Sequence, residues 1–183
     1  SPWLTRAMRV TGGSPFETGA FRDGWLYAQD EASQLVPMLA RESPAGPIVD
    51  MCAAPGGKTL QLSEEVGRGG PVVALDRSRR RLDQVVDNVA RCRVASVVPV
   101  VADLEAARPP VRPGGAAVVL LDAPCTGTGT IRRRPELRLR LRRRDPGRAA
   151  VRQGRMLDHA ATIVAPGGRL VYSVCSITAE EGE

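Results

Sequence analysis

Aromatic side chains and long apolar runs are both scarce in this sequence. Phe, Trp and Tyr make up only 3% of the 183 residues, whereas hydrophobic residues together make up 43%. A domain of this length can bury a sizeable core, which here must consist mainly of Val, Leu and Ala. No apolar run approaches the roughly 20 residues that a membrane helix needs, and no signal peptide is found. We therefore expect a cytoplasmic protein without a membrane partner.

Histidine and paired cysteines are also lacking, which argues against two kinds of site. His159 is the only histidine and no G-x-S-x-G motif is present, so a Ser-His-Asp hydrolase is not expected. The cysteines are far apart and form no C-x-x-C pair, so we expect no zinc or other metal site. They are Cys52, Cys92, Cys125 and Cys175. We expect all four to be free thiols.

Lysine is nearly absent, although the chain is basic. Lys58 is the only lysine among 26 basic residues, which face 20 acidic ones and give a net charge of +6. A basic domain favours a polyanionic partner, of which nucleic acid is the commonest. Charge alone is equally compatible with a merely soluble basic surface.

Apolar, strand-like runs alternate with helix-like segments from residue 48 onward. Strands are predicted at Ile48–Met51, Val72–Leu75, Val97–Ala102, Ala117–Leu121 and Arg169–Val174. Helices are predicted at Tyr27–Arg41, with a kink or break at Pro37, and at Thr59–Val66, Ser78–Arg91 and Arg148–Val164. Pro166–Gly168 is predicted to be a turn. This alternation predicts an α/β fold with a doubly wound, mainly parallel sheet covered by helices on both faces.

The stretch Asp50–Thr59 joins the first predicted strand to a helix through small residues. Small residues let a ligand approach the backbone, and free N–H groups at a helix start favour an anionic or carboxylate-bearing ligand. A Walker A loop would need Gly at position 52, which is Cys52, so a phosphate-binding loop of that kind is excluded. The G-x-G-x-x-G fingerprint is also absent, which argues against a nicotinamide enzyme.

Polar residues follow the predicted strands at the edge where parallel sheets bind ligands. These residues are Asp50, Asp76, Asp103, Asp122 and Cys175. Helix capping accounts for one or two such carboxylates but not for the whole set. Asp76 can accept hydrogen bonds from both ribose hydroxyls of a nucleoside cofactor, with Arg77 keeping it ionised. Asp103 can accept one from an adenine amino group.

Two cysteines are predicted to face this edge of the sheet. Cys125 belongs to a Pro-Cys pair in the stretch Asp122–Thr130, and Cys175 follows the last predicted strand. A single cysteine is usually a buried structural residue. Two thiols after neighbouring strands favour a catalytic pair instead.

Taken in order, these motifs resemble the catalytic core of the RsmB/Sun-type (Nol/Nop/Sun) RNA cytosine-5 methyltransferases. The resemblance runs from Gln29–Ser33 to the end and covers about four-fifths of the chain. It implies a Rossmann-like class I methyltransferase fold. The implied S-adenosylmethionine site consists of Cys52, Ala53, Ala54, Pro55, Gly56, Gly57, Lys58, Asp76, Asp103 and Asp122.

The resemblance also implies catalytic roles, but it leaves one question open. It makes Cys175 the nucleophile and Cys125 the assisting thiol, with Asp122 holding the base. Cytosine-5 DNA methyltransferases instead take their nucleophile from the Pro-Cys pair, which here is Cys125. Position alone does not rank the two thiols.

The expected substrate is RNA, with ribosomal RNA favoured over transfer RNA. The Arg-rich segment 132–144 is placed to contact phosphates, although alternating Leu and Arg residues equally favour a strand-like or solvated basic face. The alternative function is a non-catalytic RNA-binding domain that retains the fold. The oligomeric state is not predictable from this sequence.

Two features depart from the family pattern. Val174 precedes Cys175 where the family usually has Thr, and the chain ends at Glu183, soon after the fifth strand. We therefore expect residues 1–26 to form a linker or the tail of an upstream region. Residues 27–183 are expected to form a catalytic core that is incomplete at its C-terminal end, with the fifth strand at the edge of the sheet.

Overall fold

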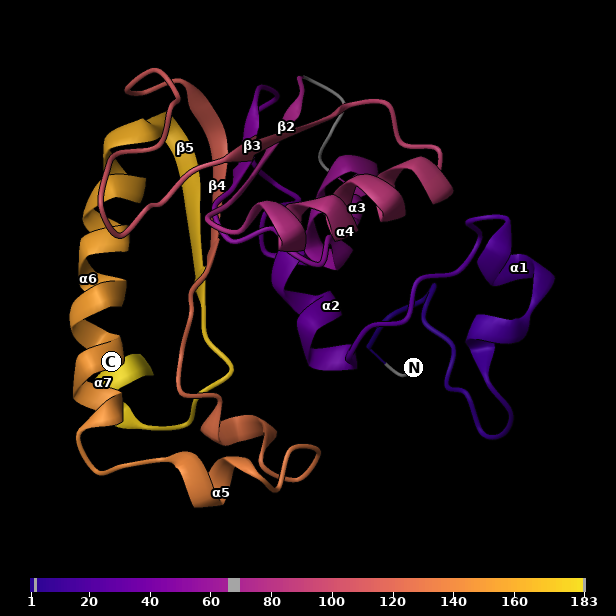
Figure 1. Cartoon of the computed structure of the whole chain (residues 1–183). Coiled ribbons are helices and arrows are strands. Elements are labelled where there is room, and N and C mark those ends of the chain that lie inside the picture. Colours follow the sequence, from indigo (N-terminus) through magenta and orange to yellow (C-terminus); the bar gives the residue numbers. More distant parts are fainter. Residues whose placement is uncertain (2, 66–69, 183) are drawn as a thin grey trace.

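Five parallel strands form one sheet in the order β3-β2-β1-β4-β5, in a computed structural model that describes residues 1, 3–65 and 70–182 (Figure 1). The strands are β1 (Ile48–Asp50), β2 (Val72–Asp76), β3 (Val97–Val101), β4 (Ala116–Asp122) and β5 (Val164–Ser173). The central strand β1 pairs with β2 on one side and β4 on the other. The chain therefore builds the sheet outward in one direction from β1 to β3 and then in the other from β4 to β5, and this reversal of strand order is expected of a doubly wound fold.

Helices cover both faces of the sheet, as predicted. Helix α6 (Asp145–Ile163) packs on β4 and β5, while α2 (Glu31–Met38), α3 (Gly57–Glu65) and α4 (Arg79–Arg91) lie on the opposite side (Figure 1). The short elements are η1 (Pro15–Glu17), α1 (Gly19–Arg22), η3 (Thr128–Thr130), α5 (Leu137–Arg140) and α7 (Ala179–Gly182). In the described part of the chain, no helix is both long and apolar enough to cross a bilayer.

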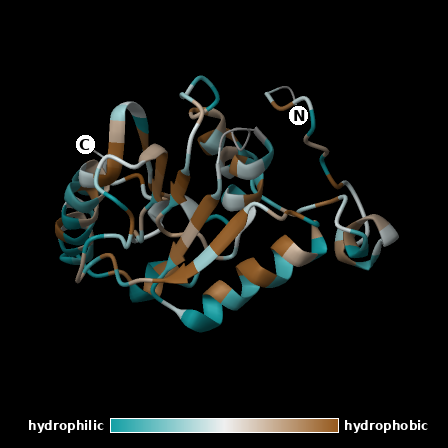
Figure 2. Ribbon diagram, turned by 90° about the horizontal axis from the view of Figure 1, so that it is seen from above, coloured by the Kyte–Doolittle hydropathy of each residue, from teal (hydrophilic) through white to brown (hydrophobic). Residues whose placement is uncertain are grey.

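Alternate side chains of the central strands form two separate core layers. Val119 and Leu121 pack with Met156 and other residues on the α6 face, whereas Val118 and Leu120 pack with Leu62 on the other face. The strands are therefore apolar on both sides, and the outer surfaces of the helices are hydrophilic (Figure 2). The core is aliphatic, as the shortage of aromatic residues predicts.

The helix predicted at Tyr27–Arg41 is shorter than expected. It begins at Glu31, after the extended N-cap residue Asp30, and ends at Met38, one residue beyond the buried Pro37. The predicted break at Pro37 is thus confirmed as the end of the helix. The helix α3 begins at Gly57, two residues earlier than predicted, and the predicted terminal residue Val66 lies outside the described residues.

The expected turn at Pro166–Gly168 is instead an irregularity inside β5. Pairing passes from Ala116 with Val164 to Val118 with Arg169, so the β5 chain bulges between the two pairs. Gly167 has a φ of +74°, and a Cβ on Gly168 would lie 2.9 Å from the carbonyl oxygen of Ala117. The strand β5 pairs only with β4 among the described strands, so it lies at the sheet edge, as predicted.

The first 26 residues contain two short helical turns and contact the body of the domain through Arg91. Its guanidinium lies 4.0 Å from the centre of the Phe21 ring and donates to the carbonyl oxygens of Phe21 and Leu26 at 2.7 and 2.9 Å. The division into a linker or upstream tail at 1–26 and a core at 27–183 stays a prediction.

Replacing Gly168 should destabilise the fold through steric overlap at the β5 bulge. The new Cβ of Gly168→Ala would meet three backbone oxygens at 2.8 to 3.1 Å, so we expect a loss of about 1–3 kcal/mol in the free energy of unfolding. The matched control is Gly154→Ala on α6, where nothing lies within 4 Å, and a gain of about 0.5–1 kcal/mol is expected. Urea denaturation of both variants checks this, and equal effects would contradict it.

Candidate active site

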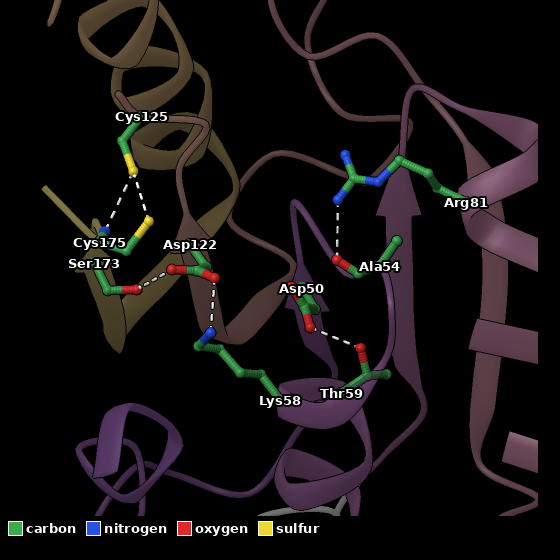
Figure 3. A network of polar contacts seen from close by, with 9 residues as sticks. All are labelled: Asp50, Ala54, Lys58, Thr59, Arg81, Asp122, Cys125, Ser173 and Cys175. Atoms are coloured by element: carbon green, nitrogen blue, oxygen red, sulfur yellow. Dashed lines mark hydrogen bonds and ion pairs between the residues drawn. The ribbon is translucent and has the colours of Figure 1, made fainter. Parts of the chain in front are cut away.

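The predicted acidic and thiol residues gather at the carboxyl edge of the sheet. Asp50, Asp76 and Asp122 are the last residues of β1, β2 and β4, and Asp103 lies two residues beyond β3. Cys175 lies two residues beyond β5. Parallel pairing brings these strand ends to one side of the molecule, where Figure 3 shows Asp50 and Asp122 near each other and the two cysteines beyond them.

The loop after β1 borders a cavity of about 190 Å³. Its lining includes Tyr27, Gln29 and Asp122, together with most of the predicted cofactor loop, namely Cys52, Ala53, Ala54, Pro55, Gly57 and Lys58. Gly56 is absent from this lining; its φ of +111° turns the chain into α3, so its role is conformational. A Cβ on Gly57 would lie 2.6 Å from the Tyr27 ring, so only glycine fits beside this wall.

Helix α4 holds this loop in place. The Arg81 guanidinium donates to the carbonyl oxygen of Ala54 at 3.0 Å, and the Asn88 side chain donates to that of Pro55 at 3.0 Å (Figure 3 shows the Arg81 bond). Two loop carbonyls are thereby fixed from outside the loop. The loop therefore keeps its conformation although its small side chains leave the cavity beside it open.

Asp50 is a buried carboxylate with one unsatisfied oxygen. Its Oδ2 accepts a hydrogen bond from Thr59 Oγ1 at 2.7 Å, but its Oδ1 has no hydrogen-bond partner among the described residues. Burial raises the pKa of Asp50 to about 6, although the Thr59 hydroxyl opposes the rise. An oxygen of this kind is available to a hydrogen-bond donor on a ligand.

A second, smaller cavity of about 80 Å³ lies on the other side of Cys52. Its lining includes Asp76, Asp103, Leu104 and Met156. Asp76 is 3% exposed and accepts a hydrogen bond from the Ser78 N–H at 2.9 Å, and Asp103 accepts one from the Glu105 N–H at 3.0 Å. Each of these bonds uses one carboxylate oxygen, which leaves acceptor capacity for the hydroxyl and amino groups of a nucleoside.

The cation expected to face Asp76, Arg77, points elsewhere, and Arg81 takes its place. Arg77 instead contacts Glu105 at 3.2 Å, and Arg81 lies 3.5 Å from Asp76. Arg77 directly follows the strand residue Asp76, and its side chain extends toward the β3 end of the sheet. Arg81, one turn into α4, faces back toward the end of β2.

The two thiols expected to face one cleft are in direct contact. Cys125 Sγ and Cys175 Sγ are 3.0 Å apart, and the Cys175 N–H donates to Cys125 Sγ at 3.3 Å (Figure 3). A hydrogen bond from the Cys125 thiol lowers the pKa of Cys175 to about 7, and the nearby Lys58 cation acts in the same direction. The same thiol bond raises the pKa of Cys125. Cys175 is therefore the sulfur that ionises more easily.

Lys58 is paired with Asp122. The Lys58 Nζ lies 2.7 Å from Asp122 Oδ2, and the Ser173 hydroxyl donates to Asp122 Oδ1 at 2.7 Å (Figure 3). The residues Lys58 and Asp122 were expected at the site, but their pairing and the contribution of Ser173 were not. Ser173 ends β5 directly beside Asp122 in the strand register, which was the available signal.

A basic cavity of about 430 Å³ opens beside Cys125. Its lining includes Arg140, Arg148 and Arg152. The Arg-rich segment forms turns and the short helix α5 instead of a strand, and Leu139 on it is 91% exposed. Arg133 pairs with Asp30 and Arg134 with Glu136, whereas the three cavity arginines line the same cavity as Cys125.

Comparison with known proteins identifies the family. The family model for the 16S rRNA methyltransferases RsmB/F matches residues 37–183. The chain belongs to this RsmB/F family. The expected resemblance is thereby confirmed, and S-adenosylmethionine is the cofactor on which the family depends.

Relatives of known sequence and structure agree with this assignment. The ribosomal RNA small subunit methyltransferase B of Salmonella paratyphi B is 37% identical over 164 residues, which are 88% of this chain and 37% of that protein. The chain spans about two-fifths of the length of the curated relatives.

Two solved structures from Pyrococcus horikoshii have the same fold. NSun6, crystallised with SFG, matches with a TM-score of 0.79 and 31% identity over 92% of this chain and 43% of its own. A methyltransferase homolog protein matches with a TM-score of 0.78 and 33% identity over 92% of this chain and 52% of its own. The predicted Rossmann-like methyltransferase fold is confirmed.

Asp50 should make stability fall as pH rises through weakly acidic values. Its pKa is about 6 in the folded state and ordinarily 3.8, so the folded protein binds the proton more tightly. The contribution of Asp50 to the free energy of unfolding is therefore full below pH 4 and decreases by on the order of 3 kcal/mol by pH 6 or just above. Asp50→Asn should remove that decrease.

Urea denaturation between pH 4 and 7.5 measures the effect as the difference between wild type and variant. Asp83→Asn is the matched control, because Asp83 is exposed on α4 and should leave the pH dependence unchanged. A wild-type minus Asp50→Asn difference that stays constant across this range would show that Asp50 does not titrate as described.

Proposed function

We propose that this chain is the catalytic core of an enzyme that transfers a methyl group from S-adenosylmethionine to carbon 5 of cytosine in ribosomal RNA. The observation that supports this most directly is the pair of thiols, Cys125 and Cys175, in contact beside Asp122. Carbon 5 of cytosine is a poor nucleophile until a thiolate adds to carbon 6. A thiol that ionises near neutral pH is suited to that addition.

The cofactor fits the two cavities on either side of Cys52. Asp76 and Asp103 would accept hydrogen bonds from the ribose hydroxyls and the adenine, and the loop from Cys52 to Lys58 would hold the methionine part. The free Oδ1 of Asp50 is a further acceptor near that loop. When bound, S-adenosylmethionine supplies an electrophilic methyl group.

In this proposal Cys175 begins the reaction as the nucleophile. Its thiolate forms a bond to carbon 6, and the ring electrons make carbon 5 the atom that takes the methyl group. Asp122, held by Lys58 and Ser173, faces the same edge and accepts a hydrogen bond from the base. Because both partners fix its carboxylate, Asp122 needs no rearrangement to hold the base.

Cys125 completes the reaction in this proposal. After methyl transfer, a base takes the proton from carbon 5, the electrons of that C–H bond restore the ring double bond, and the bond from carbon 6 breaks to release Cys175 as a thiolate. Cys125 Sγ lies 3.0 Å from Cys175 Sγ, so it is within reach of the same base and is placed to assist that release.

The basic cavity beside Cys125 supports RNA as the substrate. Arg140, Arg148 and Arg152 line it and can contact phosphates of the strand that carries the target base. The target cytosine must be single-stranded or unstacked to reach the thiols. Ribosomal RNA is proposed because curated relatives are named as ribosomal RNA methyltransferases.

Loss of the Asp76 carboxylate should weaken cofactor binding. Hydrogen bonds to a charged group contribute about 1.5–3 kcal/mol, so Asp76→Ala should raise the dissociation constant of S-adenosylmethionine by roughly ten- to a hundredfold. Titration calorimetry measures this in a protein carrying the chain. Asp87→Ala removes an exposed carboxylate from α4 and should leave the constant unchanged. An unaltered constant for Asp76→Ala would remove Asp76 from the cofactor site.

The two cysteine variants should fail at different steps. Cys175→Ala should lower methyl transfer by roughly a thousandfold or more and form no covalent RNA complex, because attack is lost. Cys125→Ala should still attack and methylate, then stall with RNA bonded to Cys175. Denaturing electrophoresis of a protein carrying this chain, with unmodified ribosomal RNA and S-adenosylmethionine, detects that adduct. The control variant Cys92→Ala removes a free thiol that lines none of the cavities of the site, and it should behave as wild type.

Each other result has a definite meaning. If the adduct accumulates with Cys175→Ala and not with Cys125→Ala, the roles are reversed and the nucleophile is in the Pro-Cys pair. If neither variant changes activity, the two-thiol mechanism is wrong. Cofactor and RNA binding without methyl transfer in the wild type would favour a non-catalytic RNA-binding domain.

A further inference from the structure

Glu181 is a buried carboxylate that the proposed reaction leaves without a role. It lies on the four-residue helix α7, its residue is 2% exposed, and it was not among the residues expected at the site. Its Oε2 accepts hydrogen bonds from the Thr126 N–H at 2.9 Å and from Gln153 Nε2 at 3.0 Å. Its Oε1 accepts from the hydroxyls of Ser176, at 2.7 Å, and of Thr126.

Two of these donor residues, Thr126 and Ser176, belong to the loops that carry the thiols. Thr126 directly follows Cys125, and Ser176 directly follows Cys175. The two hydroxyls also lie 3.2 Å from each other, and Thr128 Oγ1 lies 2.7 Å from that of Ser176. One carboxylate thus connects the residue after each cysteine. The loops are also joined directly, because the Gly129 N–H donates to the Cys175 carbonyl oxygen at 3.0 Å and the Ile177 N–H donates to Thr128 Oγ1 at 2.9 Å. Glu181 is the acceptor that both loops share.

Glu181 is held in the ionised form despite its burial. Burial alone raises the pKa of its carboxyl group, but the hydrogen bonds from Thr126, Ser176 and Gln153 outweigh burial and lower it. Gln153, on α6, also donates to the carbonyl oxygen of Pro124, directly before Cys125. The Cys125 loop is therefore held on both sides of the cysteine, and Glu181 takes part in both attachments.

We propose that Glu181 is a positioning residue that fixes the distance between Cys125 and Cys175 and thereby the reactivity of the thiol pair. It touches neither sulfur and acts through Thr126 and Ser176. Without it, the two loops lose their shared acceptor, and only the direct bonds between them remain to hold the thiols at 3.0 Å. The relevance to catalysis rests on the proposed function, whereas the effect on the thiols does not.

The test is the pH dependence of cysteine alkylation in a protein carrying this chain. Iodoacetamide labelling of each cysteine is quantified by peptide mass spectrometry from pH 5.5 to 10. In the wild type, Cys175 should react with a midpoint near pH 7, as its pKa of about 7 requires. In Glu181→Ala the midpoint should move toward that of an ordinary cysteine. Labelling at pH 7 should then slow by roughly tenfold, because an ordinary thiol is only a few per cent ionised there.

Three comparisons separate positioning from other effects. Glu180→Ala removes an exposed carboxylate from the same helix and should leave the midpoint unchanged. Glu181→Gln keeps one carbonyl acceptor without the charge, so its midpoint should fall between wild type and Glu181→Ala. Circular dichroism and S-adenosylmethionine binding should be retained in every variant, since no residue of α7 lines either cofactor cavity.

The outcomes that overturn the proposal are distinct. An unchanged Cys175 midpoint in Glu181→Ala with the fold retained would show that Glu181 does not position the thiols. Equal downward shifts in Glu181→Ala and Glu181→Gln would show that it acts only through its charge. If the midpoint shifts as expected but the wild type transfers no methyl group to RNA, Glu181 keeps its positioning role and only the proposed function fails.

Discussion

Parallel pairing of β4 with β5 is the constraint on which the site depends. Asp122 and Ser173 are partners in the register, so Cys125 and Cys175 leave the sheet from neighbouring points and in the same direction. An antiparallel neighbour would place the end of its chain at the opposite edge. In β5, the bulge lies between Val164 and Arg169, and regular pairing with β4 then continues to Ser173. The closely packed Gly168 therefore supports the site although it lies at the other end of the strand from the thiols.

Three buried or half-buried carboxylates at this edge are stabilised in three different ways. Asp122 is paired with a cation, Lys58, and Glu181 accepts several neutral hydrogen bonds. Asp50 has one hydroxyl donor and an unsatisfied oxygen, and burial raises its pKa to about 6. A buried carboxylate is tolerated where hydrogen-bond donors or a cation replace water. One oxygen of Asp50 lacks such a donor, so this is where a ligand would complete the hydrogen bonding.

Much of the fold and the membership of the site could be predicted from the sequence. Continuous apolar strands and intervening helices define a doubly wound sheet, and such a sheet places Asp76, Asp122 and Cys175 at one edge. Side-chain directions could not be predicted: Arg77, not Arg81, was expected beside Asp76. Glu181 was missed because a four-residue helix has no periodicity to reveal, and its partners are about 5 to 55 residues away.

The short distance between the two sulfur atoms has a consequence for oxidation. Sulfur atoms 3.0 Å apart need to approach by only about 1 Å more to reach the length of a disulfide bond. If one sulfur is oxidised to a sulfenic acid, the neighbouring sulfur is in place to attack it and form a disulfide. A disulfide would remove both thiols that the proposed reaction uses. The contact that would let the thiols act in sequence on one base in the proposed reaction therefore also makes the pair sensitive to oxidation.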